Sequence, residues 1–172
     1  MVRVLVSLGA LLTSIETWRV SAAMRGEIPG TEWLFPIVET LHVMALTLVL
    51  GSVAMADLRL LGLGSRKVSA SRLLEEVLPW TWAAWFAAAV FGTLMFLSKA
   101  HIYADNLQFQ LKFACMGLAA LNMAVFHLGP FKHVERWDSG VPPLAARACG
   151  ALSLTLWVSV AFLGRWVGFT TT

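Results

Sequence analysis

Charged side chains are scarce in this sequence. Asp, Glu, Lys and Arg make up only 13% of its 172 residues, about half of their share in an ordinary soluble domain. Hydrophobic residues make up 58% of the chain, and the mean hydropathy is +0.73. This balance excludes a soluble globular domain, and it predicts an integral membrane protein with one domain over residues 1–172.

Cysteine clusters and basic clusters are also missing. The two cysteines, Cys115 and Cys149, fall in predicted helices at opposite membrane depths, so we expect no disulfide between them. The net charge is +3, but the basic residues are scattered at the ends of apolar runs, which argues against nucleic-acid binding. No phosphate- or dinucleotide-binding glycine motif and no nucleophile–base pairing is found in the sequence.

Long apolar runs are what the sequence does contain. Four of them have the ~20 residues that a helix needs to cross ~30 Å of hydrocarbon. We predict an all-α fold, a four-helix transmembrane bundle, with spans at about 36–62, 78–99, 109–128 and 144–166. We expect residues 65–76 to form a loop with room for one helical turn.

Residues 1–30 precede the first span, and we interpret them as an N-terminal amphipathic helix lying in the membrane interface. Apolar side chains recur at helical spacing from Leu5 to Ile15. Trp18 is placed to anchor this helix among the lipid headgroups. Glu16 lies at the edge of the apolar stripe, so we expect it to contact protein rather than water.

Basic residues near the span ends predict the orientation of the chain. The loops after the first and third spans hold slightly more of them than the other side, where three of the six belong to the interfacial helix or its flank. The positive-inside rule therefore favours a bacterial inner-membrane protein with periplasmic termini. The basic residues on the predicted cytoplasmic side are Arg59, Arg66, Lys67, Arg72, Lys132, Arg136 and Arg147.

The first span carries ionisable residues that a simple anchor does not need, because such groups are costly at membrane depth. Glu39 and His42 are three residues apart, so they share one side of the helix. Lys112, at the mouth of the third span, matches the depth of His42, and His101 lies just above it. These four residues define the candidate site.

Haem b is the first cofactor to consider, because a buried neutral imidazole is a natural axial ligand. We expect His42 to be the principal ligand, Lys112 or His101 the opposite partner, and Glu39 the group that orients His42. Alternatively, His42 hydrogen-bonds Glu39 or another helix and only fixes packing, and the residues leave both interpretations open. Arginines suit propionate groups; the candidates are Arg59, Arg147 and Arg165.

Two other classes of function remain open. His42 and His101, with Glu39 and Asp105, supply ligands suited to zinc, iron or copper, as in a metal permease or chaperone. The same polar residues also fit a packing network in a non-catalytic subunit of a larger membrane complex or a homo-oligomer.

The far end of the first span carries Asp57 and Arg59, which we interpret as interfacial ion-pairing residues unless one of them turns toward His127. One face of the third span is polar at both ends and small or soft between them. It is either a wall for a planar cofactor or a helix-packing face. Its residues are Lys112, Cys115, Met116, Ala119, Met123 and His127.

Several of these residues belong to recognisable motifs. WLFP-x-x-E-x-LH, then DLRLLG, then Lys112, Asn122 and His127, resembles a bacterial inner-membrane family of four-helix proteins of unknown function, over about residues 33–128. His42 followed by Arg59, and Lys112 ahead of His127, is more remotely similar to the HemJ-type protoporphyrinogen oxidase.

The second resemblance implies a small four-helix membrane protein that binds haem b and oxidises a porphyrinogen. Its functional residues would be His42, Arg59 and Lys112. The function that we expect is therefore electron transfer, or oxidation of a lipophilic small molecule such as a porphyrin or a quinone.

Overall fold

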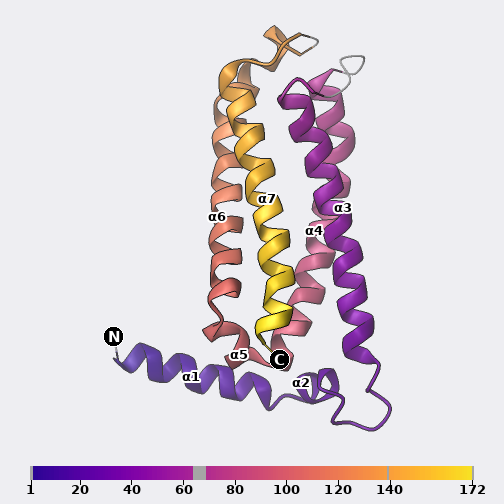
Figure 1. The fold of residues 1–172 in the computed structure, drawn as a ribbon, viewed down its shortest axis with the longest axis vertical. Coiled ribbons are helices and arrows are strands. Elements are labelled where there is room, and N and C mark those ends of the chain that lie inside the picture. The colour runs from indigo at the N-terminus through magenta and orange to yellow at the C-terminus, as the bar shows by residue number, and fades with distance from the viewer. Residues whose placement is uncertain (1, 64–68, 139, 172) are drawn as a thin grey trace.

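A computed structural model of the protein describes residues 2–63, 69–138 and 140–171, which form helices and their connections. Four long helices run side by side as an upright bundle (Figure 1). Each is long and apolar enough to cross a membrane. The predicted all-α, four-helix transmembrane bundle is thereby confirmed. The helices are α3 (Leu34–Leu60), α4 (Ala70–Ser98), α6 (Leu107–Leu128) and α7 (Leu144–Thr170).

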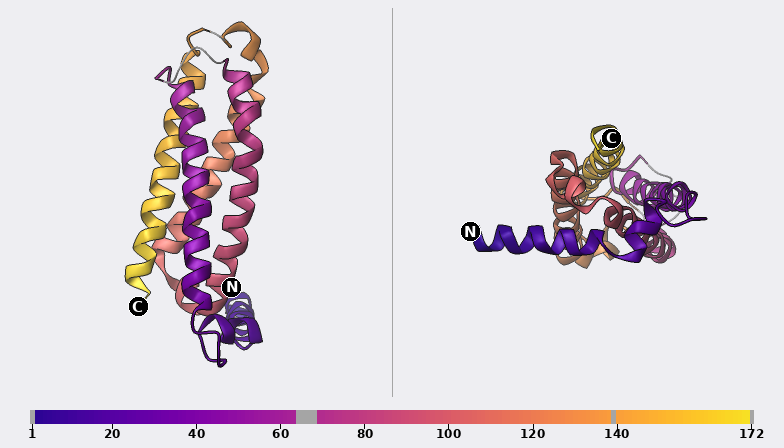
Figure 2. Two further views of the ribbon diagram at one scale, coloured as in Figure 1. Left: turned by 90° about the vertical axis from the view of Figure 1, so that its right-hand side faces the viewer. Right: turned by 90° about the horizontal axis from the view of Figure 1, so that it is seen from below.

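Short helices cover one end of the bundle, which we call the α1 end. Helix α1 (Val2–Glu16) lies across this end of the bundle and contacts α5 (Ala100–Asp105) (Figures 1 and 2). The predicted single interfacial helix is broken at Trp18, whose extended backbone separates α1 from α2 (Arg19–Met24). Glu16 accepts a hydrogen bond of 2.9 Å from the backbone N–H of His101, which confirms its predicted contact with protein.

Helix α4 begins at Ala70, so the loop predicted for residues 65–76 is wrong over its second half. The Ser69 side chain accepts a hydrogen bond from the backbone N–H of Arg72 and caps the helix. The first turns are polar outside and bury Leu74 inside, a pattern that a search for apolar runs misses. Pro79 lies within α4 rather than at its start. Arg66 and Lys67 lie outside the described residues.

The bundle consists of two helix pairs, α3 with α4 and α6 with α7, which are joined where α7 packs on α3. Gly150 of α7 makes that crossing close. A Cβ atom added there would lie 3.0 Å from the Cβ of Leu60 and 3.1 Å from the carbonyl oxygen of Asp57. Small residues of this kind allow transmembrane helices to approach each other. Both cysteines are free, as expected.

The opposite end of the bundle, which we call the η1 end, contains the short 3-10 helix η1 (Pro130–Arg136). Arg59 is only 2% exposed there, and its Nη2 donates a 2.7 Å hydrogen bond to the carbonyl oxygen of Asp138. The carboxylate of Asp138 accepts two hydrogen bonds of 2.7 Å from the N–H and hydroxyl of Ser71. This network ties α3 and α4 to the segment that leads into α7.

We expect Gly150→Ala to destabilise the bundle by about 1–3 kcal/mol, the usual cost of overpacking a tight contact. The added methyl group meets backbone of α3, which cannot move aside as a flexible side chain can. Thermal unfolding in detergent measures the effect. Gly117→Ala is the matched control, because nothing lies within 4 Å of a Cβ at that site, and an equal loss in both variants would contradict the assignment.

We also expect an acid-dependent loss of stability at Asp138. Burial raises the pKa of its carboxyl group, but the hydrogen bonds from Ser71 and its neighbours together outweigh burial and hold the pKa below its ordinary value. The stabilisation is therefore full above the unfolded-state pKa of about 3.9 and is lost as the pH falls through the lower folded-state value.

The melting temperature measured against pH tests this expectation. Asp138→Asn should lower the melting temperature at neutral pH and flatten its fall in acid. Glu135→Gln is the control, because Glu135 makes no hydrogen bond or ion pair with a described residue, and its variant should follow the wild-type profile. An unchanged acid profile in the Asp138 variant would contradict the role of this carboxylate.

Candidate functional site

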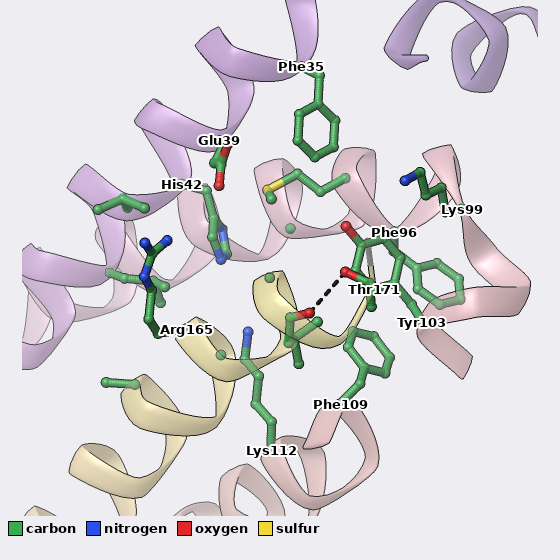
Figure 3. A pocket seen from close by; sticks show the side chains of 18 of the residues that line it. Phe35, Glu39, His42, Phe96, Lys99, Tyr103, Phe109, Lys112, Arg165 and Thr171 are labelled. Carbon is green, nitrogen blue, oxygen red and sulfur yellow. Dashed lines mark hydrogen bonds between the residues drawn. The ribbon is translucent and has the colours of Figure 1, made fainter. Parts of the chain in front are cut away.

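A cavity of about 520 Å³ lies between the two helix pairs at the α1 end (Figure 3). All four long helices and α5 contribute to its wall. Its volume falls within the range of about 300–1,000 Å³ that is typical of small-molecule and cofactor sites. Its ionisable lining residues are Glu39, His42, Lys99, Tyr103, Lys112 and Arg165.

His42 projects from α3 into this cavity with one ring nitrogen fixed. Its Nδ1 lies 2.8 Å from the carbonyl oxygen of Ala88 in α4. Because a carbonyl only accepts, Nδ1 carries the proton and donates, and Nε2 is left as the acceptor of the neutral ring. The ring packs on Gly92, where an added Cβ would lie 3.0 Å from Cε1. The carbonyl of Ala88, rather than the predicted Glu39, therefore holds the orientation of His42.

Lys112 of α6 reaches the same cavity from the opposite side. Its side chain lies over Gly164 of α7, where an added Cβ would be 3.5 Å from Nζ. Its ammonium group makes no hydrogen bond or ion pair with a described residue, and it is close enough to His42 to interact with it electrostatically. Figure 3 shows this group directed toward the space beside His42. The structure thus brings together the two residues that the sequence placed at matched depth.

The cavity carries more positive than negative charge. Lys99, Lys112 and Arg165 face a single carboxylate, Glu39. The guanidinium carbon of Arg165 lies 4.9 Å from the centre of the Phe169 ring. A ligand with negatively charged groups suits such a lining, since lysine and arginine recognise carboxylates well.

Aromatic rings form the wall next to α5. The rings of Phe96 and Phe109 stack with their centres 5.6 Å apart, and the Tyr103 ring lies 5.7 Å from Phe109. Burial, and after it the negative charge of Glu39, raises the pKa of the Tyr103 phenol above its ordinary value. The Tyr103 phenol and the Glu39 carboxylate are therefore near enough to interact electrostatically.

Two predicted site residues lie elsewhere. The ring of His101 faces α1, with Nε2 3.0 Å from the hydroxyl oxygen of Thr13. Arg59 lies at the η1 end, ~25 Å along α3 from His42 at 1.5 Å per residue, and does not line this cavity. Throughout the described part of the chain, no three His, Cys, Asp or Glu residues gather as metal ligands. The site of His42, His101, Glu39 and Asp105 that a bare metal needs is therefore not assembled.

A second cavity, of about 610 Å³, lies at the η1 end. Asp57 and His127 both line it. From the sequence, a role of Asp57 or Arg59 beyond ion pairing required that one of them turn toward His127, and Asp57 shares this cavity with His127. The expected ion pair of Asp57 is wrong, because no ion pair of this residue occurs within the described ranges. The predicted face of the third span lines both cavities, with Lys112 in the first and Met116, Ala119, Met123 and His127 in the second.

The contact that orients His42 could not be predicted from the sequence. The partner of His42 is the backbone carbonyl of Ala88, and every residue has a carbonyl. Gly92 is a partial signal, because a glycine in an alanine-rich span marks a close approach, but its neighbour could not be named without the fold.

The chain was compared with known protein families, curated proteins and solved structures. The model of a family of unknown function, DUF6644, matches residues 31–170. This range contains both quoted motifs and all four long helices. No curated protein and no solved structure matches the chain.

The raised pKa of Tyr103 provides a direct test of the cavity geometry, because Tyr103 is the single tyrosine of the chain. Titration of phenolate absorbance in the detergent-solubilised protein reads this pKa alone. Glu39→Gln should lower the pKa, because the repelling charge is removed, while burial keeps it above its ordinary value. Asp105→Asn should leave the pKa unchanged, and an effect of that control equal to the effect of Glu39→Gln would refute the contact.

Proposed function

The chain belongs to this family of unknown function, DUF6644, and we propose that it binds haem b in the cavity at the α1 end, with His42 as the principal axial ligand. Its role is electron transfer or the oxidation of a lipophilic substrate. The observation that carries the proposal is the His42 ring, which lines the cavity: its Nδ1 donates to the Ala88 carbonyl, and its Nε2 has no hydrogen-bond partner among the described residues.

The ligand set favours a porphyrin over a bare metal ion. A zinc, iron or copper site built by protein alone needs three or four side-chain ligands, and the described residues offer no such group. A haem iron receives four ligands from its own macrocycle and needs only one or two from the protein. The His42 imidazole, oriented by its hydrogen bond to Ala88 in a cavity of this size, meets that need.

The charged side chains that line the cavity suit the propionate groups of haem b. Haem b carries two propionates, and Lys99 and Arg165 supply cations for them at the α1 end. Of the three arginines considered as partners of the propionates, Arg165 is the one that lines this cavity. Lys112 lies across from His42, where its amine is the proposed opposite ligand.

The protein groups have separate tasks in this proposal. The hydrogen bond from Nδ1 to Ala88 fixes the tautomer and makes Nε2 a better electron donor to a metal. Met95 and Phe96 are apolar wall residues that exclude water from the face of a bound planar group. Haem, when bound, supplies the one-electron chemistry. The porphyrin substrate and the quinone remain the two proposed lipophilic partners.

The location belongs to the proposal as well. The described helices are those of a multi-pass membrane protein, and we place it in the bacterial inner membrane with periplasmic termini, on the basis of its basic residues. The α1 end, with the haem cavity, then faces the periplasm.

An absorption spectrum of the purified protein, oxidised and then reduced with dithionite, tests the proposal. We expect an intense Soret band that shifts on reduction. His42→Ala should lose the pigment, whereas His127→Ala should keep it, because His127 lies in the other cavity. Imidazole added to His42→Gly should restore the band, which a folding defect would not allow.

Two results would overturn this assignment. The first is a colourless wild-type protein from cells well supplied with haem. The second is a His42→Ala variant that binds as much haem as the wild type. Lys112→Met refines the assignment: retained haem with altered reduced bands indicates that Lys112 is the opposite ligand.

A further inference from the structure

Asp57 is a buried carboxylate that the proposed function does not use. It is only 4% exposed, and its Oδ2 has no hydrogen-bond partner among the described residues. The Ser153 hydroxyl donates a hydrogen bond to the same carboxyl group. Arg59 is two residues away and therefore on another side of α3, where it binds the Asp138 carbonyl. The charge of Asp57 is thus not balanced by any described residue.

The carboxylate lines the cavity at the η1 end, which has room for a ligand of about 610 Å³. The wall is mostly apolar and includes Trp82, Trp85 and Trp157. Trp82 and Trp85 pack edge to face, with ring centres 5.9 Å apart. Tryptophan rings attract cations through their faces, and more strongly where water is excluded.

His127 is a further polar residue of this wall, beside Ser52, Thr81, Asn122 and Ser153. Its Nδ1 lies 2.9 Å from the carbonyl oxygen of Met123 in its own helix, so this nitrogen donates and Nε2 is an acceptor. Asp57 and His127 are thus acceptors in this cavity, and none of the described residues that line it is a lysine or an arginine.

We propose that the cavity at the η1 end binds a hydrophobic organic cation, an ammonium group on an apolar body, with Asp57 as its counter-ion. Burying a carboxylate in apolar surroundings is costly unless a positive charge is brought next to it. An ammonium ligand supplies both this charge and an N–H donor for Oδ2. A neutral hydroxyl ligand, such as a quinol, offers a donor but leaves the charge unbalanced. This site is separate from the haem cavity and does not depend on it.

Three probes that share one apolar body and differ in head-group charge test the proposal. They are phenylbutylammonium, phenylbutanol and phenylpentanoate, and their binding to the detergent-solubilised full-length protein is measured by equilibrium dialysis. We expect the ammonium to bind tightest and the carboxylate weakest. Asp57→Asn should weaken ammonium binding at least about tenfold, as expected when a charged partner is lost.

Glu39→Gln is the matched control, because it removes the same charge from the other cavity and should leave ammonium binding unchanged. His42→Ala should also leave it unchanged, so a failure of the haem proposal does not affect this result. The inference is overturned if phenylbutanol binds as tightly as the ammonium, or if Asp57→Asn binds it normally. Should Asp57→Asn not fold, the order of the three probes on the wild-type protein decides alone.

Discussion

Hydrocarbon offers no hydrogen bonds, and this constraint determines where each polar side chain in the four spanning helices lies. Most of the hydroxyl groups bond to their own helix, as Thr47 does to the carbonyl oxygen of Val43 at 2.9 Å. A second group bonds across to a neighbouring helix, as His42 does to Ala88 and Asn122 to the Cys149 carbonyl at 2.9 Å. Two ionisable groups that line the cavities are incompletely satisfied within the described residues: Lys112 makes no hydrogen bond there, and Asp57 Oδ2 has no partner although Ser153 bonds to the same carboxyl group. The constraint therefore separates polar residues that are satisfied within the bundle from those for which we propose a ligand.

Helix α3 gives the two cavities opposite chemistry. It supplies His42 to the α1 end and Asp57 to the η1 end, and these residues lie about 60° apart around the helix and ~22 Å apart along it. The first cavity adds Lys99, Lys112 and Arg165, whereas the described residues that line the second include no lysine or arginine. One bundle thus contains a site suited to acidic groups and a site suited to a cation, at opposite ends of the helices.

The sequence predicted those features that depend on a single helix. Apolar run length gave four spanning helices, and membrane depth paired His42 with Lys112 before their helices were known to face each other. Features that depend on two helices were harder to predict. The start of α4 was missed because its first turns are amphipathic, and Arg59 was assigned to a ligand although it binds the Asp138 carbonyl. The Ala88 carbonyl had no sequence signal, because backbone groups differ only in where the fold places them.

Lys112 and Asp57 carry opposite charges, yet they line different cavities and cannot neutralise each other. Each is costly in an apolar bundle, and a leucine or methionine at either position would pack without that cost, since buried charges are often replaced with a gain in stability. Folding alone therefore does not account for them. A ligand of opposite charge would account for them. Such a ligand neutralises the unbalanced side chain, and a ligand without that charge leaves the side chain unbalanced, so the side chain selects for the charged ligand. On this argument, Lys112 and Asp57 are better explained by the ligand that we propose for each cavity than by the stability of the fold.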